Sequence, residues 1–203
     1  MRPPFYAFVA VVSWPVTKFA YRLKAKGVEH VPRDGGFVLA ANHPANFDPW
    51  PLGIPLIPRR TLRFMAKVEL FNPILSPLLE AAGAFPVRRG QADFEAIETA
   101  VRLVRDGEVV VMFPEGTRRS KGLRKKFQPT PHSGAARIAL AADAPLVPAA
   151  ISGTDRLARL GPLRVAYGPP VPMDDLNELA PREAAQIATD RLMQEIERLR
   201  ATL

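Results

Sequence analysis

The sequence predicts a single α/β domain preceded by an apolar N-terminal helix. Short apolar runs of four to six residues alternate with helical stretches along most of the chain, which is the order of elements in α/β folds. The 203 residues are enough for one domain with one substantial core. Dispersed prolines and the absence of a repeat leave no sign of an internal domain boundary.

The first element is an apolar segment flanked by bases. Residues 3–17 carry no charge, and as a helix they would be about 22 Å long against about 30 Å of hydrocarbon in a bilayer. We therefore expect residues 1–27 to form a helix lying on an anionic membrane surface, kinked at Pro15, with packing on the domain as the alternative. The flanking bases are Arg2, Lys18, Arg22, Lys24 and Lys26.

The remaining elements follow from hydrophobic spacing. Predicted strands occupy residues 37–41, 62–66, 84–87, 109–113, 146–151 and 163–167. Between the third and fourth of these runs, apolar residues from Phe94 to Val104 recur at helical spacing. A similar stripe from Ala188 to Leu203 predicts a C-terminal amphipathic helix, with Arg191 and Glu195 paired on its outer side.

Charge and composition narrow the classes of function. The formal net charge of +8 predicts an anionic partner: nucleic acid, lipid headgroups or a phosphorylated substrate. Aromatic residues are only 8%, and no nucleic-acid-binding motif accompanies the bases, so we expect no nucleic-acid partner. The absence of cysteine excludes disulfides and a cysteine nucleophile. No two histidines stand at metal-ligand spacing, so we expect no metal.

A first candidate site directly follows the run 37–41, in the segment Asn42-His43-Pro44-Ala45-Asn46-Phe47-Asp48-Pro49. Strand ends in α/β sheets are where ligands usually bind. If the turn folds Asp48 back onto one imidazole nitrogen of His43, the other nitrogen is free to accept a proton, as in an oriented general base. The alternative is that Asp48 only caps the helix that begins at Pro49. The other histidines, His30 and His132, are expected at the surface.

Two further motifs follow predicted strands. Phe113-Pro114-Glu115-Gly116-Thr117-Arg118 offers a close backbone approach, a hydroxyl and a guanidinium that Glu115 could hold in place. Gly83-Ala84-Phe85-Pro86-Val87-Arg88-Arg89-Gly90 adds two guanidiniums. Arginines delivered by two separate strands favour a phosphate pocket, although either segment alone could be a solvated turn.

Taken in order, four segments resemble the sequence blocks of the glycerolipid acyltransferases, and most closely those of the lysophosphatidic acid acyltransferases. They are Asn42-His43-x4-Asp48-Pro49, Gly83-x5-Arg89, Phe113 to Arg118, and Val147-Pro148-Ala149. The resemblance runs from about residue 28 to residue 172. It implies an acyltransferase domain at 28–203 with a mixed central sheet flanked by helices.

The resemblance also implies roles for individual residues. His43 would be the general base and Asp48 would orient it. The acceptor's phosphate would be bound by Arg89 with its neighbour Arg88, and by Glu115, Gly116, Thr117 and Arg118. Pro148 would belong to the acyl-donor side. Two positions depart from the usual pattern: Ala45 replaces a common serine, and Arg88 replaces a common aspartate.

The function expected from the resemblance is transfer of a fatty acyl group from acyl-CoA or acyl-carrier protein to lysophosphatidic acid. The product would be phosphatidic acid, in phospholipid biosynthesis. The enzyme would hold no bound cofactor and would be associated with the cytoplasmic face of a membrane, in a peripheral or monotopic manner. Three alternatives stay open: another acceptor such as glycerol 3-phosphate or another lysolipid, a thioester hydrolase, and a non-catalytic membrane-binding module.

Overall fold

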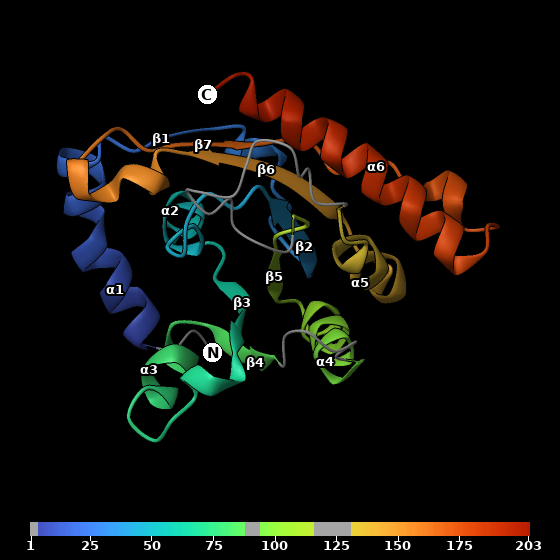
Figure 1. Cartoon of the computed structure of the whole chain (residues 1–203), viewed down its shortest axis with the longest axis horizontal. Coiled ribbons are helices and arrows are strands. Elements are labelled where there is room, and N and C mark those ends of the chain that lie inside the picture. Colours follow the sequence, from blue (N-terminus) through green and yellow to red (C-terminus); the bar gives the residue numbers. More distant parts are fainter. Residues whose placement is uncertain (1–3, 88–93, 116–130) are drawn as a thin grey trace, which may run out of the picture.

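The chain forms one seven-stranded sheet with strand order β1-β7-β6-β2-β5-β3-β4 (Figure 1). The computed structural model describes residues 4–87, 94–115 and 131–203. The strands are β1 (Lys24–Lys26), β2 (Phe37–Ala41), β3 (Leu62–Lys67), β4 (Ala84–Val87), β5 (Val109–Met112), β6 (Leu146–Ser152) and β7 (Arg164–Tyr167). The helices are α1 (Pro4–Pro15), α2 (Pro49–Gly53), α3 (Ser76–Ala81), α4 (Phe94–Arg105), α5 (Gly134–Ala142) and α6 (Pro181–Arg200).

The sheet is mixed, as predicted. β6 and β7 pair antiparallel, whereas the other neighbouring strands pair parallel. All six predicted strands are present. β1 was not predicted, because its three residues, Lys24 to Lys26, are exposed in an edge strand and have no apolar pattern.

The core is divided between the two faces of the sheet. All five residues of β2 are fully buried, which places this strand at the centre. Val38 and Ala40 pack on the face covered by α4, α5 and α6, and Phe37, Leu39 and Ala41 pack on the face covered by α2. Figure 1 shows this division into layers. Each large side chain buried in this way contributes about 1.5–3 kcal/mol to stability.

The C-terminal helix α6 is held by both apolar and charged contacts. Its buried stripe includes Ala188, Leu192 and Ile196, as the spacing predicted. The predicted pairing of Arg191 with Glu195 is wrong. Arg191 makes a two-pronged ion pair with Asp175 at 2.6 and 2.7 Å, which lowers the pKa of that carboxyl, and Glu195 pairs with Arg198. Asp175 precedes the helix, so this ion pair ties α6 to its leading loop.

The apolar N-terminal segment is helical, with a change of geometry at the proline. α1 ends at Pro15, and Val16–Ala20 continue as a wider π-helical turn. Tyr21 then anchors the segment, packing edge-on against Trp50 at 5.8 Å and donating a hydrogen bond to the Leu157 carbonyl. Within the described ranges, no helix has the length and apolar character needed to cross a bilayer.

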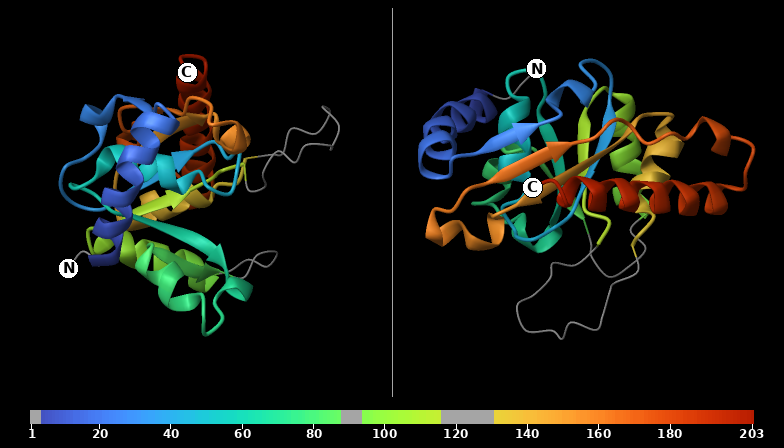
Figure 2. Two further views of the ribbon diagram at one scale, coloured as in Figure 1. Left: turned by 90° about the vertical axis from the view of Figure 1, so that its left-hand side faces the viewer. Right: turned by 90° about the horizontal axis from the view of Figure 1, so that it is seen from above.

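The C-terminal ends of the parallel strands β2, β3, β4, β5 and β6 lie side by side. They form one edge of the sheet, which runs across the strand ends and differs from the outer strands β1 and β4. In the left view of Figure 2, the arrow of β3 points to this edge. The loop that begins at Asn42 and the residues that follow Met112 leave the sheet here. The first and third sequence motifs are therefore brought to the same place.

Candidate active site

The first motif forms a tight loop between a buried strand and a short helix. β2 ends at Ala41, and α2 begins at Pro49 with proline at its first position, where no backbone N–H is needed. The Asp48 side chain does not cap α2. Instead, it turns back into its own loop, and its Oδ2 accepts a hydrogen bond from the Ala45 backbone N–H at 2.9 Å.

The same oxygen holds His43. The distance from His43 Nδ1 to Asp48 Oδ2 is 2.7 Å, and both side chains are buried. Asp48 Oδ2 accepts this hydrogen bond, so Nδ1 carries the ring proton and donates it, which leaves the other nitrogen, Nε2, as the acceptor. This arrangement fixes the ring and its tautomer, which is the requirement for a general base. The fold-back of Asp48 expected from the spacing is therefore present.

Phe113 forms one wall of this pair. Its ring stacks on the imidazole of His43 with centroids 4.0 Å apart and planes within 13°. Phe113 directly follows β5, so this contact joins the third motif to the first. Glu115 lies two residues further on, partly exposed. No role was predicted for the Phe113 ring, although its position at a strand end, in the third sequence motif, was a signal for one.

Asn42 is a second residue whose role was not predicted from the sequence. Its side-chain amide makes two hydrogen bonds with the backbone of Ile151 in β6, each 2.9 Å long. The donor Nδ2 reaches the Ile151 carbonyl, and Oδ1 accepts from the Ile151 N–H. These bonds extend the pairing of β2 with β6 by one residue and fix the backbone directly before His43. The available signal was an asparagine directly after an apolar run.

The predicted phosphate-binding residues are placed only in part. Arg88, Arg89, Gly116, Thr117 and Arg118 lie outside the described residues. Val87 is the last residue of β4, and Glu115 follows the end of the parallel strand β5 by three residues.

Pro148 lies within β6 and not at a strand end. It pairs in register with Ala40 and is buried. Its carbonyl accepts a hydrogen bond from the Gly168 N–H at 2.9 Å. His30 and His132 are exposed, as expected. No cluster of three potential metal-ligating side chains occurs in the part of the chain that the structure describes.

Comparisons with known proteins show the family to which the chain is similar. Residues 22–152 match the family model described as Acyltransferase. The chain is 33% identical over 198 residues to the 1-acyl-sn-glycerol-3-phosphate acyltransferase of Bacillus subtilis, covering 96% of each protein. The enzyme of the same name from Streptococcus pneumoniae is 26% identical, with 94% of this chain and 70% of that protein covered.

A solved structure shares the fold. The crystal structure of PlsC, the 1-acyl-sn-glycerophosphate (LPA) acyltransferase of Thermotoga maritima, superposes with a TM-score of 0.62 at 21% sequence identity. The match covers 97% of this chain and 94% of that one. Because the family model spans more than half of the chain and the Bacillus subtilis relative is matched along nearly its whole length, this protein belongs to the acyltransferase family.

Proposed function

We propose that this protein acylates lysophosphatidic acid to form phosphatidic acid. The observation that carries the proposal is the buried His43–Asp48 pair at 2.7 Å in a chain of the acyltransferase family. The names of the Bacillus subtilis and Streptococcus pneumoniae relatives support this choice of acceptor. Phospholipid biosynthesis is the process in which such a reaction takes part.

His43 acts in this proposal as a general base. Its Nε2 takes the proton of the acceptor's free hydroxyl, while Asp48 stabilises the imidazolium that forms. The alkoxide oxygen attacks the carbonyl carbon of the acyl thioester, and the resulting tetrahedral intermediate expels the thiolate. The imidazolium returns its proton to the leaving sulfur. No covalent acyl-enzyme is formed, so a chain without cysteine can carry out the reaction.

Binding of the acceptor's phosphate positions its free hydroxyl relative to His43. We assign its binding to Arg88, Arg89 and Arg118, with Glu115, Gly116 and Thr117 completing the site. Gripping the phosphate holds the hydroxyl next to Nε2, and such positioning lowers a barrier by up to about 7–11 kcal/mol in ideal cases. We assign Pro148 to the acyl-donor side. It lies in β6, the strand that pairs with β2.

The experiment that tests the proposal is thiol release from palmitoyl-CoA, with and without lysophosphatidic acid. The wild type is compared with His43→Ala and with the matched variant His30→Ala, which removes an exposed histidine elsewhere. We expect release that requires the acceptor, is lost in His43→Ala and is retained in His30→Ala. Palmitoyl-acyl-carrier protein is run in parallel, because the donor's carrier is open.

Each alternative gives a distinct result in this assay. Release without acceptor indicates a thioester hydrolase. Release only with glycerol 3-phosphate or another lysolipid keeps the base and changes the acceptor. No release with any acceptor and either donor favours a non-catalytic membrane-binding module.

We further propose that α1 and the turn after it lie on the cytoplasmic surface of an anionic membrane. This segment exposes large apolar side chains: Phe19 is 70% exposed, Val11 72% and Phe8 63%. Lys18 Nζ lies 4.4 Å from the centroid of the Trp14 ring, which pairs a base with an aromatic side chain suited to the interface. A groove of about 320 Å³ lined by Val11, Trp14, Ile54 and Ile57 adds apolar surface.

Flotation with vesicles tests this placement. We expect Phe19→Glu to reduce binding to vesicles containing phosphatidylglycerol, because it puts a negative charge on the apolar, base-flanked face. Phe94→Glu is the matched control, since Phe94 is 66% exposed on α4, across the sheet from α1. Equal binding by both variants would contradict the placement of α1 on the membrane.

A further inference from the structure

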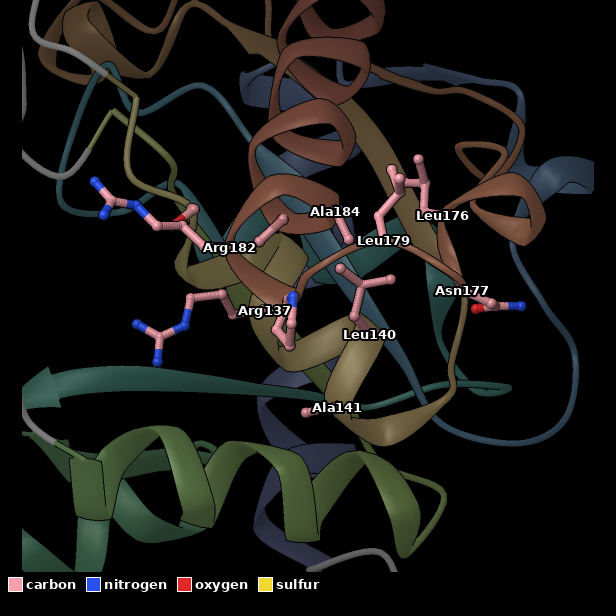
Figure 3. A pocket seen from close by; sticks show the side chains of 11 residues that line it. Arg137, Leu140, Ala141, Leu176, Asn177, Leu179, Arg182 and Ala184 are labelled. Atoms are coloured by element: carbon pink, nitrogen blue, oxygen red, sulfur yellow. The ribbon is translucent and has the colours of Figure 1, made fainter.

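A second hollow, of about 820 Å³, lies between α5, the start of α6 and the loop before α6. Its floor is apolar and includes Leu140, Leu176 and Leu179, and its rim carries Arg137 and Arg182 (Figure 3). This volume is in the range of sites that bind small molecules. The acyl-transfer steps described above assign no role to these residues.

The two arginines are placed to receive one ligand. Figure 3 shows their guanidinium groups projecting toward the same side of the hollow, the side to which the arrowhead of β3 points. Both side chains are exposed, and neither forms an ion pair within the described ranges. The acidic neighbours Glu178 and Glu183 do not line the hollow. Two guanidiniums without a carboxylate partner suit the oxygens of a phosphate group.

The hollow is connected to the catalytic pair through a short series of contacts. Ser133, which lines it, directly precedes α5. The neighbouring His132 N–H donates a hydrogen bond to the Pro114 carbonyl at 2.8 Å. Pro114 follows Phe113, whose ring stacks on His43. The hollow therefore adjoins the edge of the sheet at which His43 lies.

We propose that this hollow binds the 3′-phosphorylated ADP portion of coenzyme A, which makes acyl-CoA the donor. The inference rests on the proposed acyl transfer. The apolar floor receives the adenine, and Arg137 and Arg182 hold the phosphates, leaving the flexible pantetheine arm to reach His43. An acyl-carrier protein carries a phosphate on the same arm but has no adenine to fill a concave apolar floor, so the hollow fits the nucleotide better.

The test compares donors that differ only at this end. Palmitoyl-CoA and palmitoyl-pantetheine carry the same thioester, but only the first has the nucleotide. We expect the double variant Arg137→Gln/Arg182→Gln to raise the KM for palmitoyl-CoA about tenfold, which corresponds to about 1.4 kcal/mol. Its kcat, its KM for lysophosphatidic acid and its activity with palmitoyl-pantetheine should stay within about twofold of wild type. Arg102→Gln, an exposed arginine on α4, is the control.

Binding measured without turnover separates this inference from the proposed function. Calorimetry with coenzyme A should show binding to the wild type that the double variant weakens by a similar factor, with thermal unfolding unchanged. If the wild type transfers no acyl group but binds coenzyme A through these arginines, the proposed function is wrong, whereas the assignment of the hollow to coenzyme A is supported. An unchanged KM for palmitoyl-CoA, or a loss seen only with palmitoyl-acyl-carrier protein, overturns the assignment of the hollow to the nucleotide.

Discussion

The Asp48 carboxylate uses a single oxygen for two contacts. Oδ2 accepts from the Ala45 N–H and from His43 Nδ1, while Oδ1 is buried with no hydrogen-bond partner among the described residues. A buried carboxylate that keeps one oxygen unpaired is costly for the fold. Its position is explained by what it does to His43: it sets the tautomer, the ring orientation and the stability of the protonated ring.

Replacing this carboxylate by an amide tests that role. We expect Asp48→Asn to lower kcat by about 10²–10⁴-fold, because an amide can donate to Nδ1 and so favours the tautomer with a proton on Nε2. The KM for lysophosphatidic acid should change little. Steady-state kinetics and a thermal melt measure both effects, and a variant that unfolds without a specific loss of kcat would assign Asp48 to stability alone.

Asn42 acts one residue earlier, through the backbone. Asn42→Ala leaves the Ile151 N–H and carbonyl without their side-chain partner, and an unsatisfied buried polar group costs about 1–3 kcal/mol. We expect a lower free energy of unfolding by chemical denaturation and a fall in kcat, because the start of the His43 loop loses its attachment to β6. Loss of stability with unchanged kcat would show that Asn42 does not position His43.

At the scale of elements, α6 is packed tightly against the β6–β7 pair. A Cβ added at Gly168, the residue after β7, would lie 2.9 Å from Cγ of Pro148 and 3.3 Å from Cδ1 of Leu199. The ring of Pro148 and the last turn of α6 therefore leave space for glycine alone. Pro148 thus has a packing role in addition to any role toward the donor.

This contact predicts the effect of adding one methyl group. Gly168→Ala should lower the free energy of unfolding by about 1–3 kcal/mol, as overpacking of a filled core does. Gly161→Ala is the matched control, since a Cβ there meets no atom within 4 Å. Urea denaturation of the two variants measures the difference, and equal midpoints would show that α6 moves aside without cost.

At the scale of the whole molecule, the charge and the apolar α1 segment act together. The formal net charge is +8, and bases follow α1 at Lys18, Arg22, Lys24 and Lys26. Attraction between these bases and anionic lipids is screened by salt, because the Debye length falls from about 10 Å at 0.1 M to about 3 Å at 1 M. Burial of apolar side chains is not screened in this way.

A salt series should therefore separate the electrostatic contribution to membrane binding from the apolar contribution. We expect affinity for phosphatidylglycerol vesicles to fall by about tenfold or more between 0.1 and 1 M NaCl, at about 1 kcal/mol per base near the surface in low salt. Residual binding at high salt should be lost in Phe19→Glu. Flotation across a salt series measures both parts, and binding that does not depend on salt would assign it to apolar contact alone.

The buried strands and the His43–Asp48 pair were predictable from the sequence because their signals are local. The run Phe37–Ala41 is apolar on both faces, as a central strand must be, and only four residues separate the strand-end His43 from Asp48, which precedes a proline. The family and its reaction class follow from the same short segments. The strands, the pair and the family motifs each depend on residues that are close together in the chain, and such residues can be recognised in the sequence itself.

The contacts between distant segments were decided by the tertiary structure. Phe113 reaches His43 because β5 pairs with β2, and Asn42 reaches Ile151 because β6 pairs with β2 on the other side. β1 forms because it pairs with β7 at the side of the sheet. Arg191 pairs with Asp175 and not with Glu195, because the turn of the chain before α6 brings Asp175 close to it. Which strands pair, and which path a loop takes, depend on the whole fold. A local pattern of residues therefore cannot predict these contacts.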